Sequence, residues 1–586
     1  MGVLDDVNLY LVNDTDGMSS FMRWLGERRD VLGVDTETSG FSHHRDKIRL
    51  IQFGDINTGW AIPWERWSGV AIEALNKYEA PIVLHNSQYD MRFITTHAGK
   101  DLKRWKWDWC DDTMTMAHLL DPKRPKGLKP LAAMHIDTQA AAAQSQLDAG
   151  MADNKWSWGT VPIDYPPYWI YAAMDPVLTC RLHQKFKPAV DASYREVYNL
   201  EMGVLRVLAN MMLKGARVNP DYVTEMITKL SGWTAKALDW TASEYGVTSS
   251  MANQKIVAAF DKLGVKLPHK LTNSGNQAMD KEVLELIDHP LAETILQIRK
   301  FEKQVGPYFK HFLNDADENG RVHPTIWGLG TRTGRMSITD PALQTLPKRD
   351  PTVRKAIIPS ENHHLVSIDA DQIEARLAAH FSGDMGMRDA FLADGDFFVE
   401  LTKQIYDDQT VVKSDPRRSL TKGVVYGKLY GAGVPTMAAT ARVGEDQMGA
   451  IVSKFDTTFP GIRRLQLAIE GTARQRIRDE GEAYVVTPMG RKLYSDKYKE
   501  YTLMNYLIQS HAAEVFKKNL LLLDAAGFGD YLILPVHDEV VMDVPADSSA
   551  DILHEAELVM NDDTTYSVPI TWSGEIMKTS WGAKSD

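Results

Sequence analysis

Three apolar segments of the sequence each run directly into acidic residues. The segments VLGVDTE, HHLVSID and LILPVHDEV place Asp35, Asp369 and Asp538 at or just beyond the end of a predicted β-strand. Carboxylates are costly to bury beside apolar strands unless hydrogen bonds or a cation compensate them. Taken alone, VHDEV is most simply a hairpin with a solvated polar tip. If the strand that ends at Asp369 pairs beside this hairpin, however, Asp369 and Asp538 can bind divalent cations together.

Length and composition predict a large cytoplasmic protein with several cores. The chain has 586 residues, of which 44% are hydrophobic, so one core is not enough. No apolar run reaches about 18 residues and the start lacks a signal peptide, so we expect no membrane contact. The two cysteines exclude a disulfide framework and a cysteine-rich zinc site. The net charge of -12 decides nothing about nucleic acid, because binding depends on local basic surfaces.

The chain changes character along its length, which predicts a multidomain α/β and α+β fold. Short apolar runs alternate with helical patterns over residues 1–190, and long helices follow over 191–320. A loop rich in Gly, Thr, Arg and Pro then leads into a strand and a helix over 321–385. Residues 386–500 are mostly helical, and 501–586 contain a final helix and the VHDEV hairpin. The last domain is therefore expected to be interrupted by a helical insertion.

The segment SDPRRSLTKGVVYGKLYG predicts a helix that binds a nucleotide. Asp415 and Pro416 are typical of a helix start, and Gly431 of a helix end. Cations and aromatic residues recur at every fourth position, which places them on one face of the helix: Arg418, Lys422, Tyr426 and Tyr430. Such a face offers stacking to a base and charge to phosphates, although a solvated charged face is the commoner explanation. A nucleotide-binding helix elsewhere in the chain favours the interpretation in which Asp369 binds a metal ion. The alternative is that Asp369 only caps the helix that follows it.

Several motifs in order resemble the family A DNA polymerases, the bacterial polymerase I type. DADQIEAR, RSLTKGVVYGKLYG and VHDEV resemble motifs A, B and C of that family, and TRTGRMSITDPALQTLP, TPMGRKLY and NYLIQSHAAE resemble its DNA-contacting segments. The resemblance implies a right-hand polymerase domain with a thumb (191–320), a palm in two parts (321–385 and 501–586) and fingers (386–500). It also implies addition of dNTPs to a primer by two Mg²⁺ ions in each active site, with Mn²⁺ as a substitute.

The resemblance assigns roles at the polymerase site position by position. Asp369 and Asp538 would bind the two metals, and Glu539 would support them. The nucleotide would be bound by a further set: Arg418 and Lys422 at the triphosphate, Tyr426, Gln372, and Glu374, braced by Tyr430, as a gate against a ribose 2′-hydroxyl. Lys422 would also act as general acid toward the pyrophosphate. Because many relatives carry Phe where this chain has Tyr426, we expect it to accept dideoxynucleotides readily.

Contacts with DNA are the least specific part of the resemblance, since each residue alone is an ordinary surface or packing residue. Positions near the primer end or the template minor groove would be Arg335, Gln344, Arg491, Asn505, Gln509 and His537. In the thumb, KLTNSGNQAMDKEVLELI resembles a duplex-gripping tip, with Lys270 and Asn273 as phosphate contacts. The chain departs from the family at Asp371 in motif A and at Pro535 in motif C. Pro lacks an N–H, so we expect Pro535 on an edge strand or at a bulge.

Acidic residues in the first 190 residues suggest a second active site. Asp35 and Glu37 are two apart on a strand and therefore face the same side, Asp90 follows another apolar run, and Asp175 lies one helical turn after Tyr171. Each alone is commonly structural. Together they resemble the DEDDy 3′→5′ exonucleases, which implies a ribonuclease H-like fold, two metals on Asp35, Glu37, Asp90 and Asp175, and a water oriented by Tyr171.

The arrangement of the motifs also predicts the setting of the enzyme. The exonuclease motifs begin almost at once, so we expect no 5′ nuclease domain and a compact, phage-like DNA replication enzyme that works as a monomer in the host cytoplasm. Its expected partners are primer-template DNA and dNTPs, with a helicase, clamp or other replisome protein not excluded. Two alternatives remain: a single-subunit RNA polymerase-like enzyme, which Glu374 and the exonuclease motifs disfavour, and an inactive DNA-binding replisome scaffold.

Overall fold

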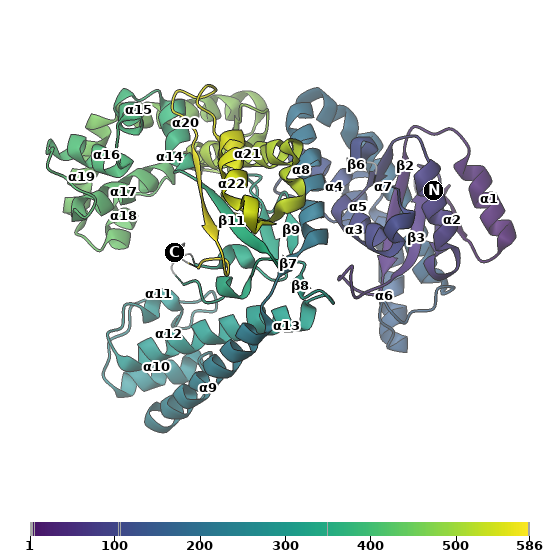
Figure 1. Ribbon diagram of the computed structural model, residues 1–586, viewed down its shortest axis with the longest axis horizontal. Coiled ribbons are helices and arrows are strands. Elements are labelled where there is room, and N and C mark those ends of the chain that lie inside the picture. Colours follow the sequence, from purple (N-terminus) through teal and green to yellow (C-terminus); the bar gives the residue numbers. More distant parts are fainter. Residues whose placement is uncertain (1–3, 5, 104, 106, 348–349, 584–586) are drawn as a thin grey trace.

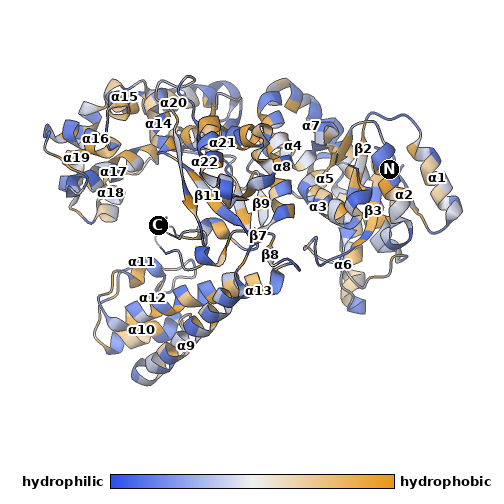
Figure 2. Cartoon of the chain, viewed as in Figure 1, coloured by the Kyte–Doolittle hydropathy of each residue, from blue (hydrophilic) through white to orange (hydrophobic). Residues whose placement is uncertain are grey.

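Three groups of elements surround a central sheet in the computed structural model, which describes residues 4, 6–103, 105, 107–347 and 350–583. Figure 1 shows the N-terminal α/β domain on the right, the palm sheet around β11 in the centre, a helical group at the upper left and a long-helix group at the lower left. Apolar residues concentrate along the strands and on the inner sides of the helices (Figure 2). Within the described residues, no helix is long and apolar enough to span a membrane.

The N-terminal domain is built on a six-stranded mixed sheet in the order β1-β4-β3-β2-β5-β6. Strand β2 lies inside the sheet, antiparallel to β3 and parallel to β5. The strands are β1 (Asn8–Leu11), β2 (Leu32–Thr38), β3 (Ile48–Gly54), β4 (Thr58–Pro63), β5 (Ile82–Leu84) and β6 (Cys110–Asp112). The helices are α1 (Thr15–Leu25), α2 (Trp64–Lys77), α3 (Ser87–Ala98), α4 (Thr113–Leu120), α5 (Leu128–His135), α6 (Ala142–Asn154) and α7 (Pro166–Ser193).

Helix α7 lies directly on this sheet because glycines permit the close approach. A Cβ added at Gly59 would stand 1.9 Å from the carbonyl oxygen of Ala173, and one at Gly33 would stand 2.5 Å from that of Pro176. Only residues without a side chain fit at these positions. The packing brings the middle of α7 over the end of β2, where the two acidic segments of the sequence meet.

The palm sheet is antiparallel, in the order β14-β15-β11-β16. Its strands are β11 (His363–Ala370), β14 (Leu532–Val536), β15 (Glu539–Pro545) and β16 (Trp572–Met577), and the helices packed with it are α14 (Ile373–Ser382), α21 (Leu503–Leu523) and α22 (Ser549–Met560). Strand β14 is at the edge, and its pairing with β15 is irregular between Leu532 and Leu534. The expectation for Pro535 is therefore confirmed: it occupies an edge strand next to a bulge.

The remaining helices form two groups on either side of the palm. The group predicted as thumb consists of α9 (Pro220–Tyr245), α10 (Asn253–Lys262), α11 (Lys281–Leu284), α12 (Pro290–Lys303) and α13 (His311–Asp315). The group predicted as fingers consists of α15 (Met385–Leu392), α16 (Phe397–Tyr406), α17 (Pro416–Leu429), α18 (Val434–Ala441), α19 (Glu445–Thr458) and α20 (Pro460–Glu480). Short paired strands join them to the palm: β7 (Ala216–Arg217) with β8 (Arg321–Val322), β9 (Thr325–Trp327) with β10 (Ser337–Thr339), and β12 (Tyr484–Val486) with β13 (Lys492–Tyr494).

Helix α8 (Arg195–Lys214) differs from the sequence prediction, which placed residues 191–320 together as thumb. It packs against α21 of the palm and α3 of the N-terminal domain. Its residues Val204 and Leu208 belong to the palm core, whereas Ala209 belongs to the N-terminal core. The long-helix group therefore begins at α9, and α8 joins the two larger bodies.

Candidate active sites

The first candidate site lies where β11 meets the turn between β14 and β15. In the ladder Asp369 stands opposite Glu539, and the N–H of Ala370 donates to the carbonyl oxygen of Asp538 at 3.2 Å. This hydrogen bond joins the residue after Asp369 to Asp538, so the backbones that carry the two carboxylates are adjacent. Helix α14 starts at Ile373 and has no side-chain cap. The alternative in which Asp369 caps this helix is therefore wrong.

Glu539 points away from this site, into the palm core. Its carboxylate accepts hydrogen bonds from Ser367 Oγ at 2.7 Å and Trp581 Nε1 at 2.9 Å, and it pairs with Arg354 at 3.3 Å. Asp538 belongs to the turn and Glu539 is the first residue of β15, so the two side chains separate where the turn becomes strand. Glu539 thus fixes the hairpin to β11 and to the C-terminal segment.

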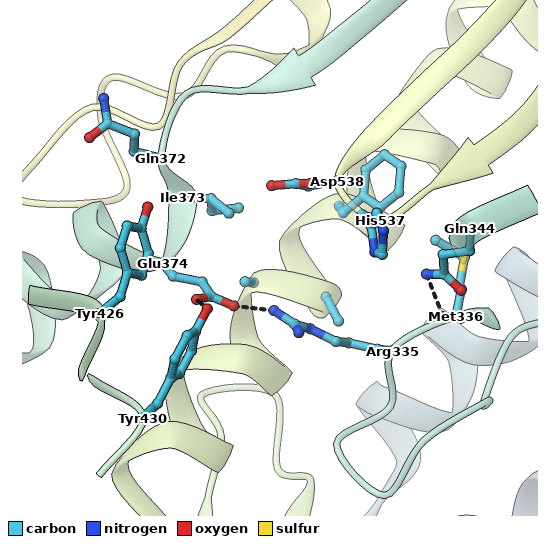
Figure 3. Close-up of a pocket in the computed structure, with 13 residues that line it drawn as sticks. Arg335, Met336, Gln344, Gln372, Ile373, Glu374, Tyr426, Tyr430, His537 and Asp538 are labelled. Atoms are coloured by element: carbon cyan, nitrogen blue, oxygen red, sulfur yellow. Dashed lines mark hydrogen bonds and ion pairs between the residues drawn. The ribbon is translucent and has the colours of Figure 1, made fainter. Parts of the chain in front are cut away.

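A cavity of about 320 Å³ opens in front of Asp538, and most of the predicted nucleotide residues line it (Figure 3). Its polar and aromatic lining includes Arg335, Gln344, Gln372, Glu374, Tyr426, Tyr430, His537 and Asp538. The Gln372 side chain points away from Glu374 and Arg335 in Figure 3. Asp538 lies at one end, and Glu374 lies with the phenol rings at the other, an arrangement that suits a ligand with both a charged and an aromatic part.

Glu374 is the centre of a bonded group inside this cavity. It is 8% exposed, pairs with the Arg335 guanidinium, and accepts a hydrogen bond from Tyr430 Oη at 2.7 Å. Tyr426 lies next to it, with its ring centroid 6.0 Å from that of Tyr430. Burial, followed by the charges of Glu374 and Asp538, raises the pKa of Tyr426 to about 12. Both phenols therefore remain protonated and can donate hydrogen bonds at neutral pH.

Helix α17 carries the predicted phosphate-binding cations, and it starts at Asp415 as the sequence predicts. Asp415 accepts from the N–H of Arg417 at 2.8 Å, which caps the helix. Lys422 is exposed, with Nζ 5.4 Å from the ring of Phe398 and 5.9 Å from that of Tyr426. Arg418, by contrast, is held by Asp396 through two hydrogen bonds of 2.8 and 2.6 Å. Sequence reasoning missed Asp396, although Asp before an apolar helical run is the usual sign of a cap.

The predicted DNA contacts separate into two sets. Arg335, Gln344 and His537 line the cavity, and Gln344 Nε2 donates to the carbonyl oxygen of Met336 at 3.1 Å. The others lie elsewhere: Asn505 and Gln509 are half-buried on α21, Asn273 is exposed in the loop before α11, and Lys270 pairs with Asp280 at 2.7 Å and with Glu282. The structure does not bring this second set to the cavity.

Arg491 does not face an open surface, contrary to what a DNA contact requires. It is 2% exposed, pairs with Glu201 of α8, and reaches Glu514 of α21 at 3.2 Å. Lys517 pairs with the same Glu201 at 2.7 Å. Buried charges need compensation of this kind, so Arg491 joins α8 to the palm.

The second candidate site lies in the N-terminal domain, where β2, α3 and α7 meet. Ligand oxygens of Asp35, Glu37 and Asp175 all lie within 4.8 Å of one another. Asp90 lies beside them and accepts a hydrogen bond from Thr36 Oγ1 at 2.6 Å. The sequence prediction that Asp35 and Glu37 face the same side of a strand is confirmed.

The carboxylates of the second site are held in conditions that oppose their ionisation. Burial, and then repulsion from Glu37, raises the pKa of Asp35. Burial and Asp35 raise the pKa of Asp90, and burial raises the pKa of Glu37 to about 8. A site of several hard oxygen ligands under mutual repulsion fits divalent cations of the Mg²⁺ or Mn²⁺ type. Asp369 and Asp538 offer the same donor chemistry at the first site.

Two further residues of the second site were missed from the sequence. The ammonium group of Lys129, which is 6% exposed, pairs with Asp175 and lies 4.1 Å from the ring centroid of Tyr171. The only sequence signal was the motif GLKPLAA around it. Phe41, three residues after the end of β2, is 87% exposed, which is unusual for a large apolar side chain.

Comparisons with known proteins identify two family domains in the chain. The model of the family described as DNA polymerase family A matches residues 219–583, and that described as 3′-5′ exonuclease matches residues 10–191. The DNA polymerase of Mycobacterium phage D29 is 30% identical over 99% of this chain and 97% of that protein, and the DNA polymerase of Mycobacterium phage L5 is 28% identical with the same coverage.

More distant relatives include bacterial enzymes. DNA polymerase I of Pseudomonas aeruginosa is 27% identical over 96% of this chain but only 65% of its own length. A solved structure of the POL domain of Pol1 from M. smegmatis, in complex with DNA primer-template and dNTP, aligns with a TM-score of 0.76 at 20% identity, over 98% of this chain and 99% of that one. The protein therefore belongs to DNA polymerase family A and combines a polymerase domain with a 3′–5′ exonuclease domain.

Proposed function

We propose that the chain extends a DNA primer with dNTPs at the cavity next to Asp369 and Asp538. The observation that carries this proposal is the backbone contact between their segments: the N–H of Ala370, next to Asp369, bonds to the carbonyl oxygen of Asp538, which lines a cavity together with Glu374, Tyr426 and Tyr430. A nucleotide triphosphate has the matching polarity, with charge at one end and a ring at the other. Primer-template DNA and dNTPs are the partners that follow.

Asp369 and Asp538 are the residues that would hold Mg²⁺, or Mn²⁺ in its place. Two such ions, when bound, lower the pKa of the primer 3′-hydroxyl and neutralise the pyrophosphate that leaves. Side chains of α17 would bind the triphosphate of the nucleotide. Lys422 is exposed and available to the triphosphate, whereas Arg418 must first leave Asp396.

Selection of the sugar is proposed to depend on Glu374. Its carboxylate is fixed from two sides, by Arg335 and by the Tyr430 hydroxyl, so it cannot easily swing away from an added 2′-hydroxyl. A rigid group discriminates by steric conflict and by loss of its hydrogen bonds. The expected substrate is therefore a deoxynucleotide.

The exonuclease site is proposed to remove mismatched primer ends. Asp35, Glu37, Asp90 and Asp175 would hold the metal ions, and the protonated phenol of Tyr171 would orient the attacking water, because burial raises the pKa of Tyr171. The exposed ring of Phe41 offers a surface on which a single-stranded base can stack. The near full-length similarity to two phage DNA polymerases supports a role in phage DNA replication in the host cytoplasm, where a helicase or clamp would be further partners.

One experiment separates this proposal from its alternatives. Purified protein is given primer-template DNA and Mg²⁺ with dNTPs or with rNTPs, and Asp538→Asn serves as the control. Extension with dNTPs that the control lacks supports the proposal. Preferential extension with rNTPs would indicate an RNA polymerase-like enzyme, and DNA binding without extension would indicate a scaffold. Degradation of a mismatched primer by the wild type, and its loss in Asp35→Ala, tests the second site.

A further inference from the structure

Lys129 places a cation among the proposed metal ligands of the exonuclease site. Its ammonium group pairs with Asp175, and its charge also acts on Glu37 and Asp35. The side chain is almost fully buried, so solvent screens these interactions only weakly. Among the residues that the structure describes, the basic side chain that forms an ion pair with the group of Asp35, Glu37 and Asp175 is that of Lys129.

Tyr171 gives the ammonium group a second contact within the site. The ring centroid of Tyr171 lies 4.1 Å from Lys129 Nζ, a distance typical of a cation–π contact. Lysine has a flexible four-carbon stem and a compact point charge, so its head group can move without a change of backbone. Lys129 is anchored near the start of α5 (Leu128–His135), next to Pro130. The ammonium can therefore leave Asp175 and keep its contact with the ring while its backbone stays fixed.

We infer that Lys129 is a tethered counter-ion that exchanges with the divalent metal of the exonuclease site. When no metal is bound, its ammonium neutralises part of the repulsion among Asp35, Glu37 and Asp175. When metal binds, the ammonium leaves these oxygens and keeps its contact with the Tyr171 ring. The inference rests on the exonuclease function proposed above. Its consequence is that exonuclease metal loading requires a higher metal concentration than the same ligands would need without Lys129.

The test measures metal affinity rather than activity. Asp369→Asn and Asp538→Asn together remove the polymerase ligands, and Mn²⁺ binding to this parent is followed by the electron paramagnetic resonance signal of free Mn²⁺. Lys129→Met keeps the length of the stem and removes the charge. We expect Lys129→Met to bind Mn²⁺ about tenfold more tightly at the exonuclease site, which corresponds to about 1.4 kcal/mol. Its unfolding temperature should fall in EDTA and recover in saturating Mn²⁺.

Lys126→Met is the matched control, because it removes the same charge from the same segment. Lys126 Nζ bonds to the carbonyl oxygens of Asp121 and Arg124 rather than to the acidic group. It should bind Mn²⁺ as the parent does. Lys129→Gln provides a second neutral variant in case Lys129→Met folds poorly.

The outcomes separate this inference from the proposed function. Equal or weaker Mn²⁺ binding in Lys129→Met and Lys129→Gln overturns the counter-ion role but leaves the exonuclease site intact. Asp35→Asn in the parent should abolish the binding. If Asp35→Asn leaves it unchanged, the proposed exonuclease ligands are wrong, and the role of Lys129 falls with them.

Discussion

Replacing Asp396 with Asn should strengthen nucleotide binding, because Asp396 competes with the triphosphate for Arg418. The two side chains form a bidentate pair with hydrogen bonds of 2.8 and 2.6 Å. Asp396 also caps α16 by accepting from the N–H of Val399 at 3.0 Å. Asn is as good a helix cap as Asp. The substitution therefore removes the charge that holds Arg418 and keeps the helix start.

The size of the effect follows from the exposure of the pair. The side chains of Arg418 and Asp396 are 20% and 22% exposed, so solvent screens their attraction. Ion pairs under such conditions contribute about 1 kcal/mol or less, and a bidentate geometry favours the upper end. A change of about 1 kcal/mol corresponds to about fivefold in a dissociation constant. We expect the dNTP dissociation constant to fall by about that factor.

Single-turnover primer extension at varied dNTP concentrations measures this constant separately from the rate of the chemical step. Asp408→Asn is the matched control, because it removes the same charge from a partner of Arg417, which keeps its pair with Asp415. The control corrects for a general gain in attraction between the fingers and phosphate. Our reasoning about Arg418 is refuted if Asp396→Asn binds dNTP no more tightly than Asp408→Asn does.

Three further predictions concern the gate, the terminator preference and the pH dependence. Glu374→Ala should raise incorporation of rNTPs relative to dNTPs by about tenfold or more, because a carboxylate fixed by Arg335 and Tyr430 is lost. The measurement is the ratio of the kcat/KM values for the two nucleotides. An unchanged ratio contradicts the role of Glu374 as a gate. Tyr426→Phe should reduce incorporation of dideoxynucleotides relative to dNTPs in primer extension, because one hydroxyl in the cavity is removed; equal rejection of terminators by both enzymes argues against the idea. Burial raises the pKa of Glu37 from 4.5 to about 8, so Glu37 contributes stability that is fully present below pH 4.5 and lost as pH rises through 8. In EDTA the unfolding temperature should fall across that window by more in the wild type than in Glu37→Gln, and an equal fall in both would show that Glu37 is not responsible.

Asp35, Asp369 and Asp538 could be predicted from the sequence because each stands at or just beyond the end of an apolar run. Alternation within a strand then fixes which neighbours share a face, as it does for Asp35 and Glu37. The start of α17 and the edge position of Pro535 were predictable for similar reasons, since both depend on local backbone chemistry. Local rules were sufficient for these positions.

Pairing between charged groups could not be predicted, because it depends on elements distant in the sequence. Arg491 has the same appearance in the sequence whether it faces DNA or Glu201, and only the packing of α8 decides. Lys129 comes into the exonuclease site from a segment about 90 residues after β2, through the tertiary fold. Asp396 was recognisable as a helix cap. Its ion pair with Arg418, however, depends on the packing of α16 against α17, which the sequence does not show.

The position of α8 limits how this polymerase can be divided or recombined. A fragment that ends at residue 191 would leave the groove for Ala209 unfilled on the N-terminal domain, and a fragment that starts at residue 219 would lack Val204 and Leu208 from the palm core. Two of the buried ion pairs of the palm would also lose Glu201. A chimaera that exchanges the exonuclease domain with that of a relative should therefore keep α8 with the polymerase and redesign the surfaces where α8 meets α3, α4 and α7.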